Sequence, residues 1–252
     1  MKLLFLGCGT STGVPVIGCT CGVCASKDPR NCRTRSSLLI QIDGKNILID
    51  ASTDLRAQAL GNGVARIDAV LFTHPHADHI LGIDDLRAFN MAQGAAIPIY
   101  ANAHTMSRIK AMFDYIFAKN GGESWRPDLT PHVIEGLLSI FGTQIVPIDI
   151  RHGTASILGF RFFDAAYVTD CSHMPAASLE KLMGIKVLII NALRRRPHPT
   201  HMNIEQALEI SRRLKPERTF LTHLSHSLDY AADNKNLPEG VELAYDGLTL
   251  EV

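Results

Sequence analysis

The residues best suited to chemistry lie in one short stretch, Thr73-His74-Pro75-His76-Ala77-Asp78-His79. It holds three histidines and a carboxylate and follows the apolar run 69–72, which predicts a buried strand. The apolar spacing from Ile80 onward predicts a helix. Imidazole and carboxylate are the ligands that a divalent ion takes when its site must stay open to water. The stretch therefore predicts a metal site rather than a group of solvated loop residues.

A second group of ligand-type residues lies near the start of the chain, where Cys19, Cys21 and Cys24 are close together. The chain is too long for a small secreted disulfide scaffold, so the group favours metal binding or redox chemistry in a reducing compartment. Structural zinc takes four N or S ligands, and the candidate for the fourth is His226. A redox pair of Cys21 and Cys24, or simply buried thiols, are the other interpretations.

Single polar residues stand at the ends of several predicted strands. His152 follows 146–151, Asp170 follows 167–169 and His223 follows 220–222. Each alone would indicate only a hydrogen-bonded strand end. Asp50 closes the second strand of a hairpin that turns at Asp43-Gly44. A buried carboxylate there needs a partner, and capping a helix predicted at 54–60 is one role for it.

Length and charge limit the classes of function. The chain has 252 residues, with Lys+Arg and Asp+Glu both 25, so no overall positive charge attracts long nucleic acid. No apolar run approaches the roughly 20 residues that span a bilayer. The N-terminal apolar run is about five residues, shorter than the roughly 7–15 of a signal peptide. We therefore expect a cytoplasmic protein without membrane contact.

The order of predicted elements indicates an α+β fold in one domain, 1–252. Each half reads as strands followed by a helix, which suits two sheets covered by helices. We interpret 105–143 as a helical insertion over the active site, with a helix at 106–119 and a further turn at 135–140. The stretch 120–131 between them holds Gly, Pro and the only tryptophan, Trp125. His104 and His132 are expected to be exposed polar residues.

The sequence THPHADH resembles the HxHxDH signature of the metallo-β-lactamase superfamily, and the strand-end residues occur in the order of that family's other ligands. The resemblance implies a four-layer αββα sandwich with two divalent ions, manganese or zinc, at its edge. It implies that a hydroxide between the two ions attacks the substrate. It also implies that Asp50 supports the metal ligands from behind, a role that can coexist with the helix cap. The implied ligands are His74, His76 and His152 for one ion and Asp78, His79 and His223 for the other, with Asp170 shared. Asp78 is also counted among the catalytic residues.

The cysteine loop with His226 resembles one branch of that superfamily, the phosphoribosyl cyclic phosphodiesterases of the carbon–phosphorus lyase pathway. There the corresponding residues hold a structural zinc. His201, just before a predicted helix at 204–215, matches the histidine that phosphodiesterases of the family use near the leaving group, which implies a catalytic role as general acid. His198 competes for that role. Arg194, Arg195 and Arg196 are either a phosphate clamp or a solvated face.

These features predict a metal-dependent phosphodiesterase that hydrolyses a small cyclic or nucleotide-like phosphate ester. The insertion at 105–143 and the arginine run depart from the carbon–phosphorus lyase enzyme, which puts an identical substrate in doubt. A tRNA 3′-processing endonuclease and a non-catalytic relative of the pyrroloquinoline quinone synthesis protein are the alternatives. The sequence lacks a long basic arm for tRNA, and no ligand of the metal set is missing. A homodimer is kept as an option.

Overall fold

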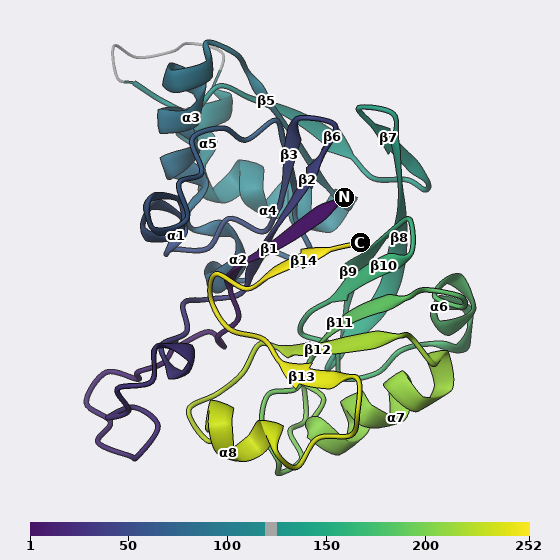
Figure 1. Ribbon diagram of the computed structural model, residues 1–252. Helices are drawn as coiled ribbons and strands as arrows, with labels where there is room; N and C mark the ends of the chain where they lie inside the picture. Colours follow the sequence, from purple (N-terminus) through teal and green to yellow (C-terminus); the bar gives the residue numbers. More distant parts are fainter. Residues whose placement is uncertain (119–124) are drawn as a thin grey trace.

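The computed structural model describes residues 1–118 and 125–252 and consists of two facing β-sheets with helices outside each (Figure 1). The first sheet has the order β14 (Thr249–Glu251), β1 (Lys2–Gly7), β2 (Ser37–Ile42), β3 (Lys45–Ile49), β4 (Ala69–Leu71), β5 (Ile97–Ala101), β6 (Leu129–Val133). The second has the order β13 (Val241–Leu243), β12 (Arg218–Thr222), β11 (Val187–Asn191), β10 (Ala165–Val168), β9 (Ala155–Phe162), β8 (Thr143–His152), β7 (Leu138–Ile140). This confirms the predicted αββα sandwich.

The strands are apolar on both faces because each sheet is covered on both sides. In β1, Leu3 and Phe5 face the core between the sheets, whereas Leu4 and Leu6 pack toward the outer helices. The first sheet is covered by α1 (Leu55–Gly61), α2 (Ala77–Ile80), η2 (Ile83–Asp85), α3 (Leu86–Gln93), α4 (Ala103–Met112) and α5 (Asp114–Phe117). The second is covered by α6 (Ala176–Lys181), α7 (Ile204–Leu214) and α8 (Tyr230–Asn234). A short η1 (Pro29–Asn31) lies in the loop between β1 and β2.

Several predicted elements differ in detail. The expected turn of helix at 135–140 is wrong, because Leu138–Ile140 is strand β7, paired with β8 through a tight turn at Phe141-Gly142. The helix expected from Ile80 instead begins at Ala77 and is interrupted before α3. Within 105–143 the described residues include β6 and β7, an edge strand of each sheet, besides helices. Lys119 and the first part of 120–131 lie outside the described residues.

The strand directions bring distant polar residues to one end of the sandwich. Strands β10, β11 and β12 run parallel, so their carboxyl ends share one edge. The same edge receives the carboxyl end of β8, which pairs antiparallel with β9, and β9 in turn with β10. The loop after β4 reaches it from the first sheet, where the N–H of Leu158 in β9 donates to the carbonyl of Thr73 at 3.1 Å. No helix in the described ranges is long and apolar enough to cross a membrane.

Candidate functional site

Seven predicted ligands gather at this edge in two adjoining groups. Within each group the ligand atoms lie within 4.8 Å of one another, so each group could hold a metal ion. The groups are His74, His76 and His152, and Asp78, His79, Asp170 and His223. Apart from the exposed His76, all of these residues are buried. Buried imidazole and carboxylate of this kind are donors that divalent ions use.

Asp170 connects the two groups, because its two carboxylate oxygens face different histidines. Oδ2 lies 3.8 Å from Nε2 of His74 in the first group. Oδ1 lies 3.4 Å from Nε2 of His79 and 3.1 Å from Nδ1 of His223 in the second. A single carboxylate between two sets of donors is the arrangement that a shared ligand requires.

The backbone is strained at three of the residues that form this edge. Asp50, Asp170 and His223 have φ angles of 61°, 55° and 56°, in the left-handed region that favours glycine. Such conformations persist only where the surroundings fix them, and they concentrate at functional sites. Each of these residues directly follows or lies just beyond a strand, so the unusual φ turns its side chain at the strand end.

Asp50 supports the loop 73–79, called here the ligand loop, from the side opposite the clustered side chains. It is completely buried, and its Oδ1 accepts the N–H of Thr73 at 2.8 Å. Its Oδ2 accepts the Thr73 hydroxyl at 2.8 Å and lies 2.7 Å from Nδ1 of His79. Helix α1 begins at Leu55 with Asp54 as its N-cap residue, so the alternative helix-cap role of Asp50 is wrong. Burial raises the pKa of Asp50 above its usual range, although His79 opposes this.

The surroundings lower the pKa of some histidines of the cluster and raise the pKa of another. Burial lowers the pKa of His74 well below its usual range and the pKa of His223 to about 4, which keeps both rings neutral near pH 7. Burial also acts to lower the pKa of His79, but Asp170, Asp50 and Asp78 outweigh it and raise that pKa well above its usual range. Two of these carboxylates, Asp78 and Asp170, face Nε2 of His79, at 3.2 and 3.4 Å.

The residues present fit a divalent metal. Nε2 of His79 is buried and has no hydrogen-bond partner of adequate geometry among the described residues, while Nδ1 of the same ring is held by Asp50. Histidines that bind metals show this arrangement, with one nitrogen on a carboxylate and the other free for the ion. Nδ1 of His152 lies 2.8 Å from the carbonyl oxygen of Thr200, which can only accept. That contact assigns the proton of a neutral ring to Nδ1 and directs Nε2 of His152 to serve as a metal ligand.

His201 lies at the mouth of the cluster. Its Nε2 is 3.2 Å from Oδ2 of Asp170, and its ring stacks on His223 with centroids 5.0 Å apart. Its Nδ1 lies 2.9 Å from the hydroxyl of Thr200 and 3.1 Å from Nδ1 of His198. Its side chain is 13% exposed, so it is reachable by a substrate. The predicted competitors therefore occupy two places: His201 touches the cluster and His198 lies behind it.

The capping box of α7 fixes this position. The side chain of Asn203 accepts the N–H of Gln206, and the side chain of Gln206 accepts the N–H of Asn203, both at 2.9 Å. These bonds satisfy donors at the start of the helix and define where it begins, with its N-cap Asn203 two residues after His201. The N–H of Met202 also donates to the carbonyl of Cys171, next to Asp170, at 2.7 Å.

The arginine run is occupied within its own loop. The guanidinium of Arg194 donates to the carbonyls of Arg196 and Pro197, at 3.2 and 2.8 Å. Arg195 forms an ion pair with Asp233 of α8. These contacts make the stretch a structured loop before His201, and the choice between a phosphate clamp and a solvated face stays a prediction.

The three cysteines and His226 come together away from this edge. Nδ1 of His226 lies 3.3 Å from Sγ of Cys19 and 3.5 Å from Sγ of both Cys21 and Cys24. Ligands at ordinary zinc–sulfur and zinc–nitrogen distances in a tetrahedron lie roughly 3.5 Å apart, so the four donors fit a zinc ion. A hydrogen bond from the N–H of Cys24 lowers the pKa of Cys21 to about 6, which favours its thiolate. The remaining cysteines are buried (Cys8, Cys171) or exposed (Cys32).

Sequence reasoning missed several residues that support the cluster. The hydroxyls of Thr10 and Ser36 lie 3.2 Å from Nε2 and Nδ1 of His223, respectively. The side chain of Asn191 bonds both backbone groups of Cys171. These contacts join positions that are distant in the chain, and no local pattern marks them. His104 and His132 are exposed, as expected, and His132 stacks on Tyr100.

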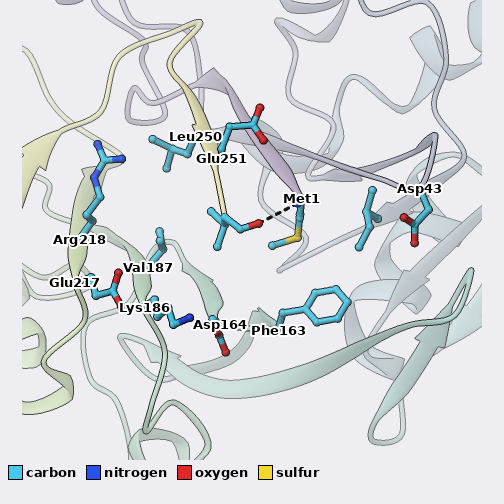
Figure 2. Close-up of a pocket in the computed structure, with 12 residues that line it drawn as sticks. Met1, Asp43, Phe163, Asp164, Lys186, Val187, Glu217, Arg218, Leu250 and Glu251 are labelled. Atoms are coloured by element: carbon cyan, nitrogen blue, oxygen red, sulfur yellow. Dashed lines mark hydrogen bonds and ion pairs between the residues drawn. The ribbon is translucent and has the colours of Figure 1, made fainter.

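A separate cavity of about 520 Å³ lies at the amino ends of β11 and β12, the opposite end of these strands from His223 (Figure 2). Its lining includes Met1, Asp43, Phe163, Lys186 and Arg218, and none of the clustered ligands. Lys186 is paired with Asp164 at 3.1 Å, so part of its charge is already neutralised. Because this cavity holds no group of metal ligands, we place the functional site at the histidine cluster.

Comparisons with known proteins agree with the geometry. The profile of a family described as Beta-lactamase superfamily domain matches residues 45–224. A crystal structure described as a new diphosphatase from the PhnP family superposes with a TM-score of 0.93 at 44% identity, covering 100% of this chain and 97% of that chain.

Two curated relatives match over long stretches. An octanoyltransferase from Porphyromonas gingivalis is 39% identical over an alignment of 259 positions that covers 98% of this chain and 51% of that protein. A ribonuclease Z from Bradyrhizobium sp. is 28% identical over 169 residues, 66% of this chain and 50% of that protein. The chain thus spans about half the length of these two relatives.

Proposed function

The chain belongs to the metallo-β-lactamase superfamily, in its PhnP-like branch, and from that premise we propose that it is a metal-dependent phosphodiesterase acting on a small phosphate ester. The observation that carries the proposal is Asp170, whose two oxygens face two separate groups of ligand-type side chains. The similarity to a diphosphatase adds small diphosphates to the substrate classes worth testing.

In this proposal two divalent ions are held at the edge of the sandwich. His74, His76 and His152 hold one, Asp78, His79 and His223 hold the other, and Asp170 is shared. When bound, such ions polarise a phosphoryl oxygen and lower the pKa of water between them, so that hydroxide is available near neutral pH. Asp50 and the carbonyl of Thr200 orient His79 and His152, so that Nε2 of each ring is directed toward an ion.

His201 is the proposed general acid. Because the carboxylate of Asp170 only accepts, the 3.2 Å contact supports Nε2 of His201 as the nitrogen that carries the proton. The departing oxygen of a phosphate ester needs a proton, and a histidine supplies one near neutral pH. Thr200 and His198 hold the opposite nitrogen and keep the ring in this orientation.

A third, structural ion completes the proposal. Cys19, Cys21, Cys24 and His226 would bind zinc in a closed site with no room for substrate. Such an ion would add to the contacts that already join the long loop after β1 to the loop after β12, such as the bond from the N–H of Thr10 to the carbonyl of Leu224. A cytoplasmic location and a homodimer stay predictions.

The proposal is tested by metal analysis followed by a substrate panel. We expect the purified protein to hold two manganese or zinc ions per chain at the edge and to hydrolyse bis(p-nitrophenyl) phosphate, 2′,3′-cyclic nucleotides or small diphosphates. A precursor tRNA tests the endonuclease alternative. Asp170→Asn is expected to abolish activity and Asp164→Asn, on the exposed surface, to leave it unchanged. A metal-loaded protein that cleaves none of the small substrates would contradict the proposal, and cleavage of the tRNA alone would favour the alternative.

A further inference from the structure

Arg33 is a charged residue in an unusual environment. It is 1% exposed and is the largest fully buried side chain of the described chain. Among the described residues no carboxylate lies within 4.0 Å of its guanidinium. Burying an unpaired charge is costly unless hydrogen bonds compensate for the lost water. The acceptors that surround Arg33 should therefore reveal its role.

Two of the four acceptors lie on the loop that carries His226. The guanidinium donates to the carbonyl of Ser225 at 3.1 Å and to the carbonyl of Leu228 at 2.8 Å, on either side of His226. It also donates to the carbonyl of Arg30 at 3.2 Å and to Oδ1 of Asn31 at 2.9 Å. A planar guanidinium with several fixed donors can hold carbonyls of different segments at once, which an ammonium group does less well.

The backbone of Arg33 holds the other half of the cysteine–histidine site. Its N–H donates to the carbonyl of Val14 at 2.7 Å, and the N–H of Val14 donates back to the carbonyl of Arg33 at 2.8 Å. Val14 leads directly into the cysteines: the N–H of Val16 contacts Sγ of Cys24 at 3.3 Å. One residue thus joins the segment that supplies the thiols to the segment that supplies the imidazole.

Asn31 strengthens this connection. Its Oδ1, besides accepting from Arg33, accepts the N–H of Tyr230 at 2.8 Å. Its Nδ2 donates to Oδ2 of Asp229 at 2.8 Å. Apolar packing anchors the segment of His226 through the buried Leu224 and Leu228, whereas the loop that bears the cysteines exposes Ile17 completely. Polar contacts through residues 31 and 33 therefore define where the two segments meet.

We propose that Arg33 is the positioning residue of the cysteine–histidine site, holding the loop of His226 against the cysteine segment so that four zinc ligands converge. The inference rests on the zinc site of the proposed function. Arg33 does not touch the ligand atoms of that site and acts through the backbone on both sides of it. Its loss should therefore weaken zinc binding while the ligands themselves remain in the chain.

The test compares Arg33→Met and Arg33→Lys with Arg212→Met, an arginine of α7 whose side chain is exposed and pairs with Glu205 of the same helix. Zinc release to a colorimetric chelator gives the rate of loss, and cobalt substitution gives an absorption spectrum that reports thiolate ligands in a tetrahedral site. We expect release from Arg33→Met to be about 10–100-fold faster than from wild type, the range found for residues that orient metal ligands. Arg33→Lys should be intermediate, and Arg212→Met should match wild type.

Two controls separate the possible failures. The variant Cys19→Ser/Cys21→Ser/Cys24→Ser shows whether wild type binds zinc at this site; equal zinc content would overturn the zinc site itself. Asn31→Ala, which removes one acceptor of the guanidinium, is measured in parallel in case Arg33→Met does not fold. Faster zinc release with an altered cobalt spectrum in any folded Arg33 or Asn31 variant supports the proposal. Release at the wild-type rate from every folded variant overturns it.

Discussion

Nδ1 of His79 lies 2.7 Å from Oδ2 of Asp50, and both side chains are completely buried. This pair determines which way the imidazole faces, because the remaining nitrogen, Nε2, is directed at Asp78 and Asp170. The same carboxylate fixes the backbone of Thr73, one residue before His74. Asp50 therefore controls both ends of the ligand loop without being a ligand itself.

Asp50→Asn should weaken metal binding while leaving every ligand in place. An amide offers one acceptor oxygen where the carboxylate offers two, so Thr73 and His79 cannot both be satisfied. We expect affinity at the site of His79 to fall about 10–100-fold, with a matching loss of hydrolysis at limiting metal. Metal content after dialysis and competition with a chelator measure this, with Asp54→Asn as the control carboxylate. Unchanged affinity would show that His79 is oriented by other contacts.

Metal binding at this edge should release a proton. In the metal-free protein the surrounding carboxylates outweigh burial and raise the pKa of His79, so its ring is charged at pH 7. To bind a metal ion, His79 must give up that proton. Burial lowers the pKa of His74 and His223, so those rings are already neutral. The apparent affinity of the protein for the divalent metal should therefore increase as pH rises through the neutral range. Calorimetric titration in buffers of different ionisation enthalpy measures the protons released, and a value of zero would contradict the prediction.

The sandwich could be predicted from sequence because its strands are apolar runs of ordinary length with turns between them. Asp43-Gly44 is an example: it forms the tight turn of the β2–β3 hairpin, with φ angles of 49° and 72°. The equivalent turn at Phe141-Gly142 has φ angles of 50° and 80°, but phenylalanine is not a typical residue there. Local signals consequently favoured a helix where β7 lies.

The helix after the ligand loop shows a second limit of structure prediction from sequence. Its interruption near Gly82 is set by tertiary contact: the N–H of Gly82 donates to the carbonyl of Ala51 at 2.9 Å, and a Cβ at this glycine would collide with the carbonyl of Ser52. Periodicity of apolar residues cannot report such an approach. For the same reason Thr10 and Ser36, which contact His223 from far along the chain, escaped sequence analysis. The ligand loop was recognisable because its donors are adjacent.

His201→Ala should reduce turnover and leave the metals bound. Removing a positioned acid lowers rates by about 10²–10⁴-fold, and the loss should be smaller for p-nitrophenyl esters, whose leaving group needs little protonation. His198→Ala, which removes only the support behind the ring, should have a smaller effect on the same substrates. Steady-state kinetics with metal analysis of each variant measure both. A fall in metal content would instead make His201 a ligand, since it also lies within reach of His152 and Asp170.

Asn191→Ala should destabilise the fold next to Asp170. Oδ1 of Asn191 accepts the N–H of Cys171 at 2.8 Å, and Nδ2 donates to the carbonyl of Cys171 at 3.1 Å. The variant leaves a buried N–H without an acceptor, which costs about 1–3 kcal/mol of the free energy of unfolding. Urea unfolding of the metal-free protein measures this, with the exposed Asn236→Ala as control. A loss no greater than that of the control would show that water or another group replaces the amide.

Asp68 should stabilise the fold near neutral pH, and this contribution should be lost in acid. Burial acts to raise its pKa, but hydrogen bonds from Arg66, the N–H of Asn46 and Lys45 outweigh burial and lower it. Because the folded protein then binds this proton less readily than the unfolded chain, the contribution to stability is complete above about pH 4 and is lost as pH falls through the lowered value.

Asp68→Asn tests that contribution. At pH 7 we expect a loss of about 1–2 kcal/mol in the free energy of unfolding, reduced from the value for fully buried partners because Arg66 and Lys45 are partly exposed. The difference from wild type should shrink as pH falls from about 4, where the unfolded wild-type chain begins to bind the proton, through the lowered pKa of Asp68 in the folded protein. Urea unfolding of both metal-free proteins between neutral and acid pH measures it. A difference that stays constant over this range would mean that the charge of Asp68 does not stabilise the fold.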